Sequence, residues 1–440
     1  MSKPVVAIVG RPNVGKSTLF NALAGENIAI IKDTPGVTRD RIYADVEWLD
    51  RQFTLIDTGG IEPESSDVIL SQMREQAQIA IDTADVIIFM TDLKQGLVDA
   101  DGKVADMLRR SHKPIILTVN KVDSFQRDEA DVYEFYNLGI GDPVAISSVN
   151  RTGLGELLDQ VIGYFPEKEQ DEEENEIPRI AVVGKPNVGK SSLVNRILGE
   201  NRMIVSDVAG TTRDAVDAHV RFQDKEYIFV DTAGLRRKNK IKEDLERYSI
   251  IRAVAAIERS DVVVVMIDAS EGVTEQDAKI TGIAHERGKG IIFAVNKWDA
   301  IEKDDKTIYT FQKKIEQILT FATYAQTVFI SAKTGQRLNR LFECIDTVIQ
   351  NQNLRVGTGV LNEIMAEAVA LQQPPTDKGK RLKLFYITQV GVKPPTFVVF
   401  VNDRELMHFT YVRYLENRIR DAFGFKGTSL RFIIRQRQEK

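Results

Sequence analysis

The sequence of 440 residues has little of two things, cysteine and long hydrophobic runs. Its single cysteine, Cys344, cannot form a disulfide within the chain, and we expect it to be a small buried apolar residue in a reducing compartment. The longest apolar run, 262–267, is far shorter than the roughly 20 residues of a membrane-spanning helix and is typical of a buried strand. The first residues show no signal-peptide pattern. These absences predict a cytoplasmic protein with no membrane partner.

Charge is small in total but unevenly distributed. The net charge is −5, yet residues 376–440 contain 14 Lys and Arg against 6 Asp and Glu, whereas the remainder contains 45 against 58. A chain of this length is typical of roughly two to four domains. The contrast in charge predicts a small basic module attached to an acidic body.

The chain contains an internal repeat of a whole domain. Gly10, Thr38 and Asp57 each recur, with similar neighbours, 174 residues later. Asn120 recurs after 176 residues and Ser147 after 184, as loop insertions would produce. Each copy is roughly 160 residues long and can therefore bury its own core, unlike the short unit of a solenoid.

Apolar β-rich runs alternate with helix-like stretches in each copy. In the first copy the runs 53–56, 86–90 and 114–119 alternate with the stretches 16–24 and 99–110, and the second copy repeats the pattern. Runs that are apolar at every position indicate strands covered on both faces. The repeat therefore predicts two α/β domains, each a mostly parallel sheet with helices on both faces.

A run of acidic residues separates the two copies. Residues 167–176 favour an extended linker; a charged helix face is the alternative, and Pro178 argues against a helix that continues into the next strand. After the second copy, the pattern predicts helix, strand, strand, helix, strand. The predicted domains are a first α/β domain at 1–166, a linker at 167–178, a second α/β domain at 179–352 and a basic α+β module at 353–440.

Each copy contains the phosphate-binding pattern Gly-x-x-x-x-Gly-Lys-Ser between a strand and a helix. Glycines allow backbone N–H groups to converge on phosphate oxygens, the lysine adds a charge, the serine offers a hydroxyl to Mg²⁺, and the helix N-terminus adds partial positive charge. The pattern alone also fits a site for ATP. The predicted loops are Gly10, Arg11, Pro12, Asn13, Val14, Gly15, Lys16 and Ser17, and Gly184, Lys185, Pro186, Asn187, Val188, Gly189, Lys190 and Ser191.

An acidic motif ends a later strand in each copy. An aspartate there can hold Mg²⁺ through water, and a glycine after it lets the backbone approach the γ-phosphate. The motifs and the residue after each are Asp57, Thr58, Gly59, Gly60 and Ile61, and Asp231, Thr232, Ala233, Gly234 and Leu235. A threonine between the two motifs is the candidate to complete the metal site. The predicted magnesium ligands are Ser17, Thr38 and Asp57, and Ser191, Thr212 and Asp231.

A third motif decides which base is bound. Its carboxylate accepts hydrogen bonds from guanine N1–H and the N2 amino group, whereas adenine has no N2 amino group, so the motif rejects adenine about 10²- to 10⁵-fold. The motifs are Asn120, Lys121, Val122 and Asp123, and Asn296, Lys297, Trp298 and Asp299. A following loop can offer a backbone N–H to guanine O6, at Ser147 in the first copy and at Ser331, Ala332 and Lys333 in the second. The spacing of these motifs predicts GTP and GDP, rather than ATP, at two sites.

The two cassettes and the basic tail together resemble the Der (EngA) family of bacterial tandem-domain ribosome-assembly GTPases, over essentially the whole chain. The resemblance implies two P-loop GTPase domains, a KH-like C-terminal domain, and a GTP-controlled switch in assembly of the large ribosomal subunit. It implies that the partners are the large subunit or its precursor and rRNA, and that the chain is a monomer. The alternative is a nucleotide-stabilised RNA- or ribosome-binding scaffold with little turnover in one domain.

The basic tail has one further motif, Gly424-Phe425-Lys426-Gly427. It has the spelling of the KH nucleic-acid clamp, but it precedes the last strand instead of joining two helices, so we interpret it as a turn. We expect Lys and Arg contacts to RNA phosphates, which depend on salt. The alternative is that the basic face docks on the acidic GTPase domains.

Neither cassette has the glutamine that follows the acidic motif of small signalling GTPases and orients the attacking water. Ile61 and Leu235 occupy those positions, and an apolar side chain cannot orient water. The resemblance implies that Asn13 and Asn187 bind a potassium ion in place of an arginine finger. The alternative is that each asparagine only caps the loop backbone.

Overall fold

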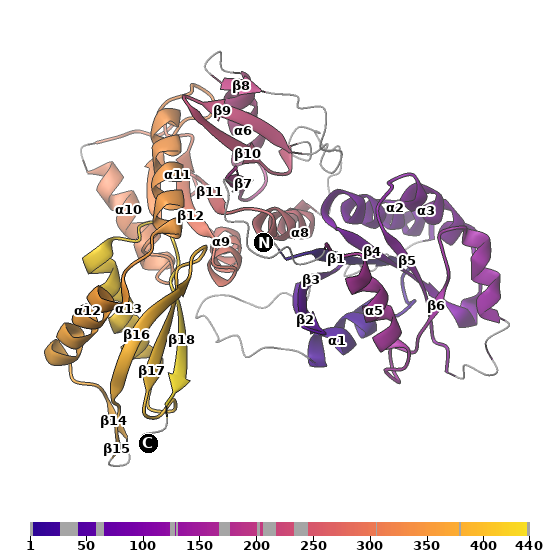
Figure 1. Ribbon diagram of the computed structural model, residues 1–440. Coiled ribbons are helices and arrows are strands. Elements are labelled where there is room, and N and C mark those ends of the chain that lie inside the picture. The colour runs from indigo at the N-terminus through magenta and orange to yellow at the C-terminus, as the bar shows by residue number, and fades with distance from the viewer. Residues whose placement is uncertain are drawn as a thin grey trace. The chain divides into compact units, whose positions relative to one another are not determined.

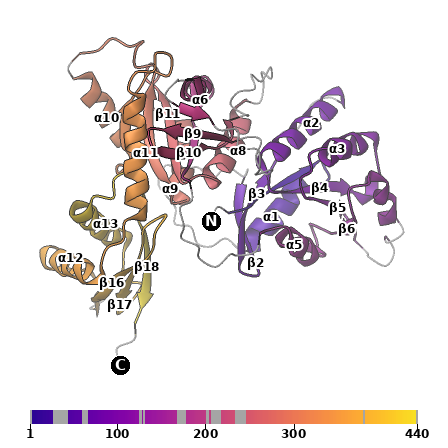
Figure 2. The ribbon, with the colours of Figure 1, turned by 45° about the horizontal axis from the view of Figure 1, so that its top comes forward.

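The computed structural model describes residues 3–26, 43–58, 66–123, 128, 131–166, 177–199, 203–205, 217–232, 245–304, 306–377 and 380–437. Contacts divide the chain into two compact units, and each is considered by itself. Unit 1 holds the first copy of the repeat and also residues 245–259. Unit 2 holds the other described residues of the second copy and the C-terminal module. Figures 1 and 2 show the elements of both units in two views.

Unit 1 is built on a six-stranded sheet in the order β2-β3-β1-β4-β5-β6, in which only the β2–β3 pair is antiparallel. Its strands are β1 (Val5–Gly10), β2 (Tyr43–Trp48), β3 (Arg51–Asp57), β4 (Val86–Asp92), β5 (Ile115–Asn120) and β6 (Val144–Ala145). Its helices include α1 (Lys16–Glu26), α2 (Ser66–Thr83), α3 (Asp99–Arg109) and α5 (Leu154–Gly163), with the 3-10 helices η1 (Leu93–Gln95) and η2 (Tyr133–Leu138).

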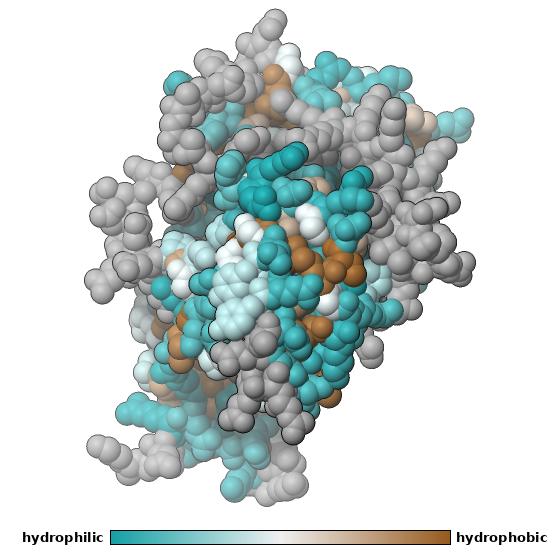
Figure 3. All heavy atoms as spheres, turned by 90° about the vertical axis from the view of Figure 1, so that its right-hand side faces the viewer, coloured by the Kyte–Doolittle hydropathy of each residue, from teal (hydrophilic) through white to brown (hydrophobic). Residues whose placement is uncertain are grey.

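Helices cover both faces of this sheet, which explains why its central strands are apolar at every position. Val6 and Ile8 of β1 enter the core beneath α1 and α5, whereas Val5, Ala7 and Val9 enter the core beneath α2 and α3. The face in Figure 3 is mostly hydrophilic, with small separate hydrophobic patches. Among the residues in the ranges given above, no helix has the length and apolarity needed to cross a membrane.

Unit 2 contains a seven-stranded sheet in the order β13-β12-β11-β7-β10-β9-β8, in which β8, β9 and β10 form the antiparallel part. Its strands are β7 (Arg179–Val183), β8 (Met203–Val205), β9 (Ala218–Phe222), β10 (Lys225–Phe229), β11 (Val262–Asp268), β12 (Gly290–Asn296) and β13 (Gln326–Phe329). Its helices include α6 (Lys190–Gly199), α9 (Glu275–Glu286), α10 (Thr307–Ile318) and α11 (Leu338–Asn353). The α/β class predicted for both copies is confirmed, and Cys344 is buried in α11 as expected.

Helix α8 (Leu245–Glu258) belongs to the second copy in sequence but packs within unit 1. Ile251 joins the core beneath α2, and Arg252 Nη2 lies 2.9 Å from Asp82 Oδ2. Thr54 Oγ1 on β3 donates a hydrogen bond of 2.8 Å to Glu258 Oε1, which is buried. These contacts join a segment of the second copy to residues of the first copy. Aligning the two copies with each other therefore does not predict them.

The C-terminal module has the predicted order of elements. A three-stranded sheet, β16-β17-β18, packs one face against two helices. Figures 1 and 2 both show the helices on the same side of the strands. The elements are α12 (Thr358–Leu371), β16 (Leu384–Gly391), β17 (Thr396–Val401), α13 (Phe409–Phe423) and β18 (Arg431–Gln436), with a short hairpin of β14 (Thr376–Asp377) and β15 (Lys380–Arg381).

The Gly424–Gly427 segment forms the expected turn, and it is packed against the second copy of the repeat within unit 2. The N–H of Gly427 donates to Tyr324 O at 2.8 Å, and its carbonyl accepts from Ile291 N–H at 2.7 Å. A Cβ at Gly427 would lie 2.2 Å from Val348 Cγ2, so no larger residue fits without a shift. The segment therefore joins the module to the seven-stranded sheet of the second copy, and it is not an open clamp.

A buried polar cluster strengthens the same junction. His285 Nδ1 lies 2.8 Å from Tyr324 Oη, and the Arg420 guanidinium of α13 lies 4.5 Å from the centre of the Tyr324 ring. Burial and the nearby Arg420 charge lower the pKa of His285 to about 4. His285 therefore stays neutral at physiological pH, and the cluster places no second positive charge beside Arg420.

Candidate nucleotide-binding sites

The first phosphate-binding loop connects β1 to α1 and is held by its own lysine. Lys16 Nζ donates to Gly10 O at 2.8 Å and to Arg11 O at 2.6 Å. Asn13 and Gly15 have φ values of 64° and 101°, so the loop uses left-handed backbone at two places. Burial lowers the pKa of Lys16 to about 8. The lysine is therefore a desolvated cation inside a ring of backbone, and a phosphate oxyanion would favour its charged form.

The second loop, between β7 and α6, repeats this geometry. Lys190 Nζ donates to the carbonyls of Gly184 and Lys185, both at 2.7 Å. The φ values are 61° at Asn187 and 106° at Gly189. Burial lowers the pKa of Lys190 to about 8 as well. The two loops share these backbone angles and the same internal hydrogen bonds.

An asparagine at the end of a central strand ties each phosphate loop to the base-binding loops. Asn120 Nδ2 donates to Val14 O at 2.7 Å, and Asn120 Oδ1 accepts from Ser148 N–H at 2.9 Å. Asn296 does the same with Val188 O at 2.8 Å and Ala332 N–H at 2.8 Å. The motifs therefore act as one assembly in each copy.

The glycine of each phosphate loop is required by this close approach. A Cβ at Gly15 would lie 2.4 Å from Asn120 Nδ2, and a Cβ at Gly189 would lie 2.2 Å from Asn296 Nδ2.

Ser148 also donates its hydroxyl to Asn120 Oδ1 at 3.0 Å. The first copy thus accommodates Ser148 where the second has Ala332, and the backbone contact is the same.

Two buried aspartates complete the cassettes and were not anticipated from the motifs. Asp92 ends β4 and lies 2.5 Å from Lys121 Nζ, and Asp268 ends β11 and lies 2.5 Å from Lys297 Nζ. Both are almost fully buried. Each pair holds the lysine that follows the motif asparagine, at φ values of 67° for Lys121 and 61° for Lys297. A signal was present in the sequence, because Asp92 and Asp268 are separated by the same 176 residues as Asn120 and Asn296.

The aspartates predicted to select guanine are exposed and ionised. Lys94 Nζ lies 2.6 Å from Asp123 Oδ2, and this hydrogen bond lowers the pKa of Asp123. A hydrogen bond from Ser331 lowers the pKa of Asp299. Both side chains are therefore carboxylates at neutral pH, the form that accepts hydrogen bonds from guanine N1–H and the N2 amino group.

Two of the three residues predicted to hold magnesium in the first copy lie together in the structure. Ser17 Oγ, at the start of α1, donates to Asp57 Oδ2, at the end of β3, at 2.9 Å. A hydroxyl and a carboxylate are hard oxygen ligands that fit Mg²⁺. In the second copy Asp231 has a φ of 53°, and its N–H donates to Asp217 Oδ1 at 3.0 Å. The described part of the chain has no cluster of three His, Cys, Asp or Glu side chains that could hold a metal by itself.

Several predicted residues fall outside the described ranges. These are the threonines proposed to complete the metal sites and the ends of the acidic motifs, namely Thr38, Gly59, Gly60, Ile61, Thr212, Ala233, Gly234 and Leu235.

Some predicted site residues support the loops with their side chains. Arg11 Nε donates to Asp101 Oδ1 at 2.8 Å, so its guanidinium faces α3. Lys185 forms an ion pair with Glu271. Thr58 Oγ1 donates to Ile8 O at 2.5 Å. Trp298 is buried and packs against Phe329. The buried apolar side chains of Val14, Val122, Val188 and Ala332 also belong to the core, Pro12 and Pro186 are partly buried, and Ser147, Thr232 and Ser331 are buried.

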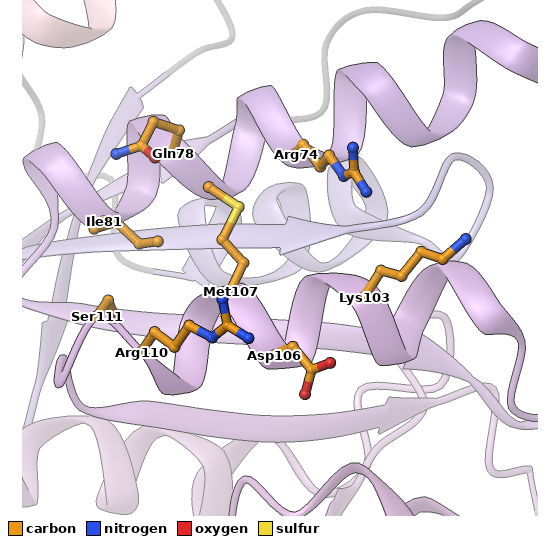
Figure 4. Close-up of a pocket in the computed structure, with 8 residues that line it drawn as sticks. All are labelled: Arg74, Gln78, Ile81, Lys103, Asp106, Met107, Arg110 and Ser111. Carbon is orange, nitrogen blue, oxygen red and sulfur yellow. The ribbon is translucent and has the colours of Figure 1, made fainter.

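A shallow groove between α2 and α3 contains none of the motif residues. Figure 4 shows Arg74 on α2, and Lys103, Met107 and Arg110 on and just after α3. Met107 points toward α2 in this view. The groove therefore belongs to the helical layer of unit 1 and is separate from the loops at the ends of β1, β4 and β5.

Two phosphate loops, two acidic motifs and two guanine motifs on P-loop sheets define a tandem GTPase. The family described as "50S ribosome-binding GTPase" matches residues 5–121 and 179–297, and "KH-domain-like of EngA bacterial GTPase enzymes, C-terminal" matches residues 355–435. The chain is 74% identical to GTPase Der of Agathobacter rectalis over 439 residues and 72% identical to GTPase Der of Lachnoclostridium phytofermentans over 439 residues, with 100% of both chains covered in each case. A solved Era structure from Aquifex aeolicus is 23% identical, with a TM-score of 0.31, over 60% of this chain and 95% of that one.

The chain belongs to the Der (EngA) family of GTPases. It binds and hydrolyses GTP in tandem GTPase domains, and its C-terminal domain is KH-like.

Proposed function

We propose that this GTPase is a nucleotide-controlled switch in assembly of the large ribosomal subunit, acting in the cytoplasm as a monomer. The observation that best supports this role is the connection of the basic KH-like module to the second cassette within unit 2, through Gly427 and the Arg420–Tyr324 contact. The matching family description names ribosome binding, and the module has an excess of Lys and Arg that suits rRNA. The proposed domains are 1–166, 179–352 and 353–440, with a linker at 167–178.

In each cassette the residues of this chain position the nucleotide. The loop lysine and backbone N–H groups bind the phosphates, Asp123 and Asp299 bind guanine, and the asparagines Asn120 and Asn296 hold the loops at the spacing a nucleotide needs. Mg²⁺, held by Ser17, Asp57 and Thr38 and by their counterparts Ser191, Asp231 and Thr212, would neutralise charge on the β- and γ-phosphates.

The backbone at the acidic motif differs between the two cassettes. Asp57 continues β3 with extended backbone, whereas Asp231 has a positive φ of 53° and its N–H bonds to Asp217. This difference favours, as a second candidate, a protein in which the second cassette holds nucleotide mainly to stabilise a ribosome-binding scaffold.

Sedimentation with ribosomal particles tests the proposed role. We expect the full-length protein to sediment with large-subunit particles when GTP or a non-hydrolysable analogue is bound, and to do so much less with GDP. Small-subunit particles are the matched control. Equal sedimentation in both nucleotide states would contradict a switch, and no sedimentation in either would contradict the ribosomal role.

The asparagines of the phosphate loops support a potassium site. Both side chains are exposed, and neither amide forms a hydrogen bond with any residue in the described ranges, which favours a role as ion ligand over capping of the loop backbone. An amide oxygen free of protein partners can coordinate a monovalent cation beside the β- and γ-phosphates, where an arginine finger acts in other GTPases.

We therefore expect GTP turnover to be faster in potassium than in sodium at equal ionic strength, by roughly tenfold or more, which is a part of the 10³- to 10⁵-fold contribution of an arginine finger. Asn13→Ala and Asn187→Ala should each remove the potassium dependence of one domain. Equal rates in the two buffers would exclude a potassium site at these residues.

A further inference from the structure

The outer face of the C-terminal sheet is the side that α12 and α13 do not cover. Phe397, Val399 and Val401 of β17 enter the core beneath the helices. Side chains alternate along a strand, so Val398 and Phe400 point to the opposite face. Strand register then places Tyr386 and Arg435 on either side of Phe400, and Ile433 beside Val398.

Two aromatic rings form the centre of this face. The rings of Tyr386 and Phe400 stack with their centroids 4.3 Å apart and their planes 11° from parallel. Both side chains are partly exposed, and Ile433 beside them is 38% exposed. Each ring uses one of its π-faces for the other ring, so the second π-face of each is directed away from the pair. The pair therefore offers two nearly parallel ring faces on which another flat ring could stack.

Positive charge lies beside the rings on the same face. Arg435 pairs with Phe400 across the strands, and Arg431 pairs with Thr396 two rows further along the same face, beyond the row of Val398 and Ile433. Both arginines are exposed, and neither side chain forms an ion pair or hydrogen bond with a residue that the structure describes. No carboxylate lies in the two cross-strand rows at the rings. These rows are Tyr386, Phe400 and Arg435, and Thr388, Val398 and Ile433. A polyanion could therefore approach these rows without repulsion from a carboxylate.

The Gly424–Gly427 turn, which has only the spelling of the KH clamp, is not an open loop here. Gly427 is buried, and its N–H and carbonyl both bond to the second copy of the repeat. This turn therefore does not offer RNA the open glycine loop of a KH clamp.

We propose that the outer face of β16, β17 and β18 binds single-stranded RNA, with bases stacked on Tyr386 and Phe400 and phosphates bound by Arg431 and Arg435. Unpaired bases stack on exposed aromatic rings of a sheet, and arginines beside them neutralise the backbone. The positive charge of Arg431 and Arg435 complements an RNA backbone, which carries a phosphate at every nucleotide. We therefore take RNA, and not a protein, as the partner of this face. This assignment rests on the proposed RNA contact of the module and names the surface that makes it.

Binding of a fluorescein-labelled oligouridylate of about 12 nucleotides to the full-length protein, measured by anisotropy across a salt series, tests the proposal. Replacing both arginines by alanine should weaken binding about tenfold at physiological salt and lower the slope of log Kd against log salt by about 1.4. Phe400→Leu keeps an apolar side chain and should weaken binding about tenfold with no change of slope. The matched control, K313A with K314A on α10, removes two exposed charges of unit 2 and should leave both quantities unchanged.

The other outcomes distinguish failure of the RNA-binding face from failure of the proposed ribosomal switch. Binding of the arginine and Phe400 variants with wild-type affinity and slope would overturn the assignment, even if ribosomal particles still sediment with the protein in GTP. Loss of particle binding by these variants, with RNA affinity intact, would show that the face binds protein, which also overturns it. Circular dichroism melts confirm that each variant is folded.

Discussion

Asp299→Asn is expected to change the second site from a guanine site to a xanthine site. The carboxylate of Asp299 is exposed, and the hydrogen bond from Ser331 lowers its pKa, so at neutral pH it is in the form that can accept hydrogen bonds from guanine N1–H and the N2 amino group. An asparagine donates from Nδ2, which clashes with the guanine amino group but matches the C2 carbonyl of xanthine. We expect GTP affinity at this site to fall about 10²- to 10⁵-fold, because the Asn Nδ2 group and the guanine amino group would be two buried donors that face each other without an acceptor. XTP affinity should rise, because the C2 carbonyl of xanthine accepts from Nδ2.

The measurement is a competition between fluorescent GDP and unlabelled GTP or XTP. Asp123→Asn should do the same at the first site, where Lys94 must also release the carboxylate. Asp304→Asn is the matched control, because Asp304 is exposed, follows the same motif closely and bonds only within its own turn around Thr307. Unchanged discrimination between GTP and XTP in Asp299→Asn would mean that another group selects the base.

Lys16→Ala and Lys190→Ala are expected to remove turnover from one cassette each. Lys16 is buried and Lys190 is partly buried, and each ammonium donates to two loop carbonyls, so on the proposed function it is preorganised where charge would develop on the phosphates. Removing a preorganised group of this kind typically costs about 10²- to 10³-fold in kcat. Each single variant should keep the turnover of the intact cassette, and the double variant should show almost none.

Steady-state phosphate release from the two single variants and the double variant gives the contribution of each domain. Lys103→Ala, an exposed lysine on α3, is the matched control for a lost surface charge. The melting temperature of the nucleotide-free variants shows whether a lost lysine has unfolded the loop. Full activity in the double variant would rule out both loops as catalytic elements.

Local motifs predict the cassettes well because their chemistry lies within a few residues. The loop conformation follows from Asn13, Gly15 and Lys16 themselves, so the pattern alone indicates its geometry. The α/β class follows equally directly, because two-sided burial makes the central strands apolar at every position.

Contacts between distant segments could not be predicted in this way. The pairing of Asp92 with Lys121 depends on the parallel register of β4 and β5, which no single motif contains. The packing of α8 in unit 1 through Glu258 and Thr54 joins residues 204 positions apart. The turn at Gly427 was predicted as a turn, but its hydrogen bonds to Tyr324 and Ile291 depend on two domains folding together.

The direct test of two complete GTP cassettes in one chain is the number of guanine nucleotides bound per chain, measured with radiolabelled GDP by equilibrium dialysis. We expect two per chain for the unaltered protein, one for Asp123→Asn or Asp299→Asn, and none for the variant with both changes. A saturating value of one for the unaltered protein, or a value that Asp123→Asn or Asp299→Asn does not lower, would contradict the account.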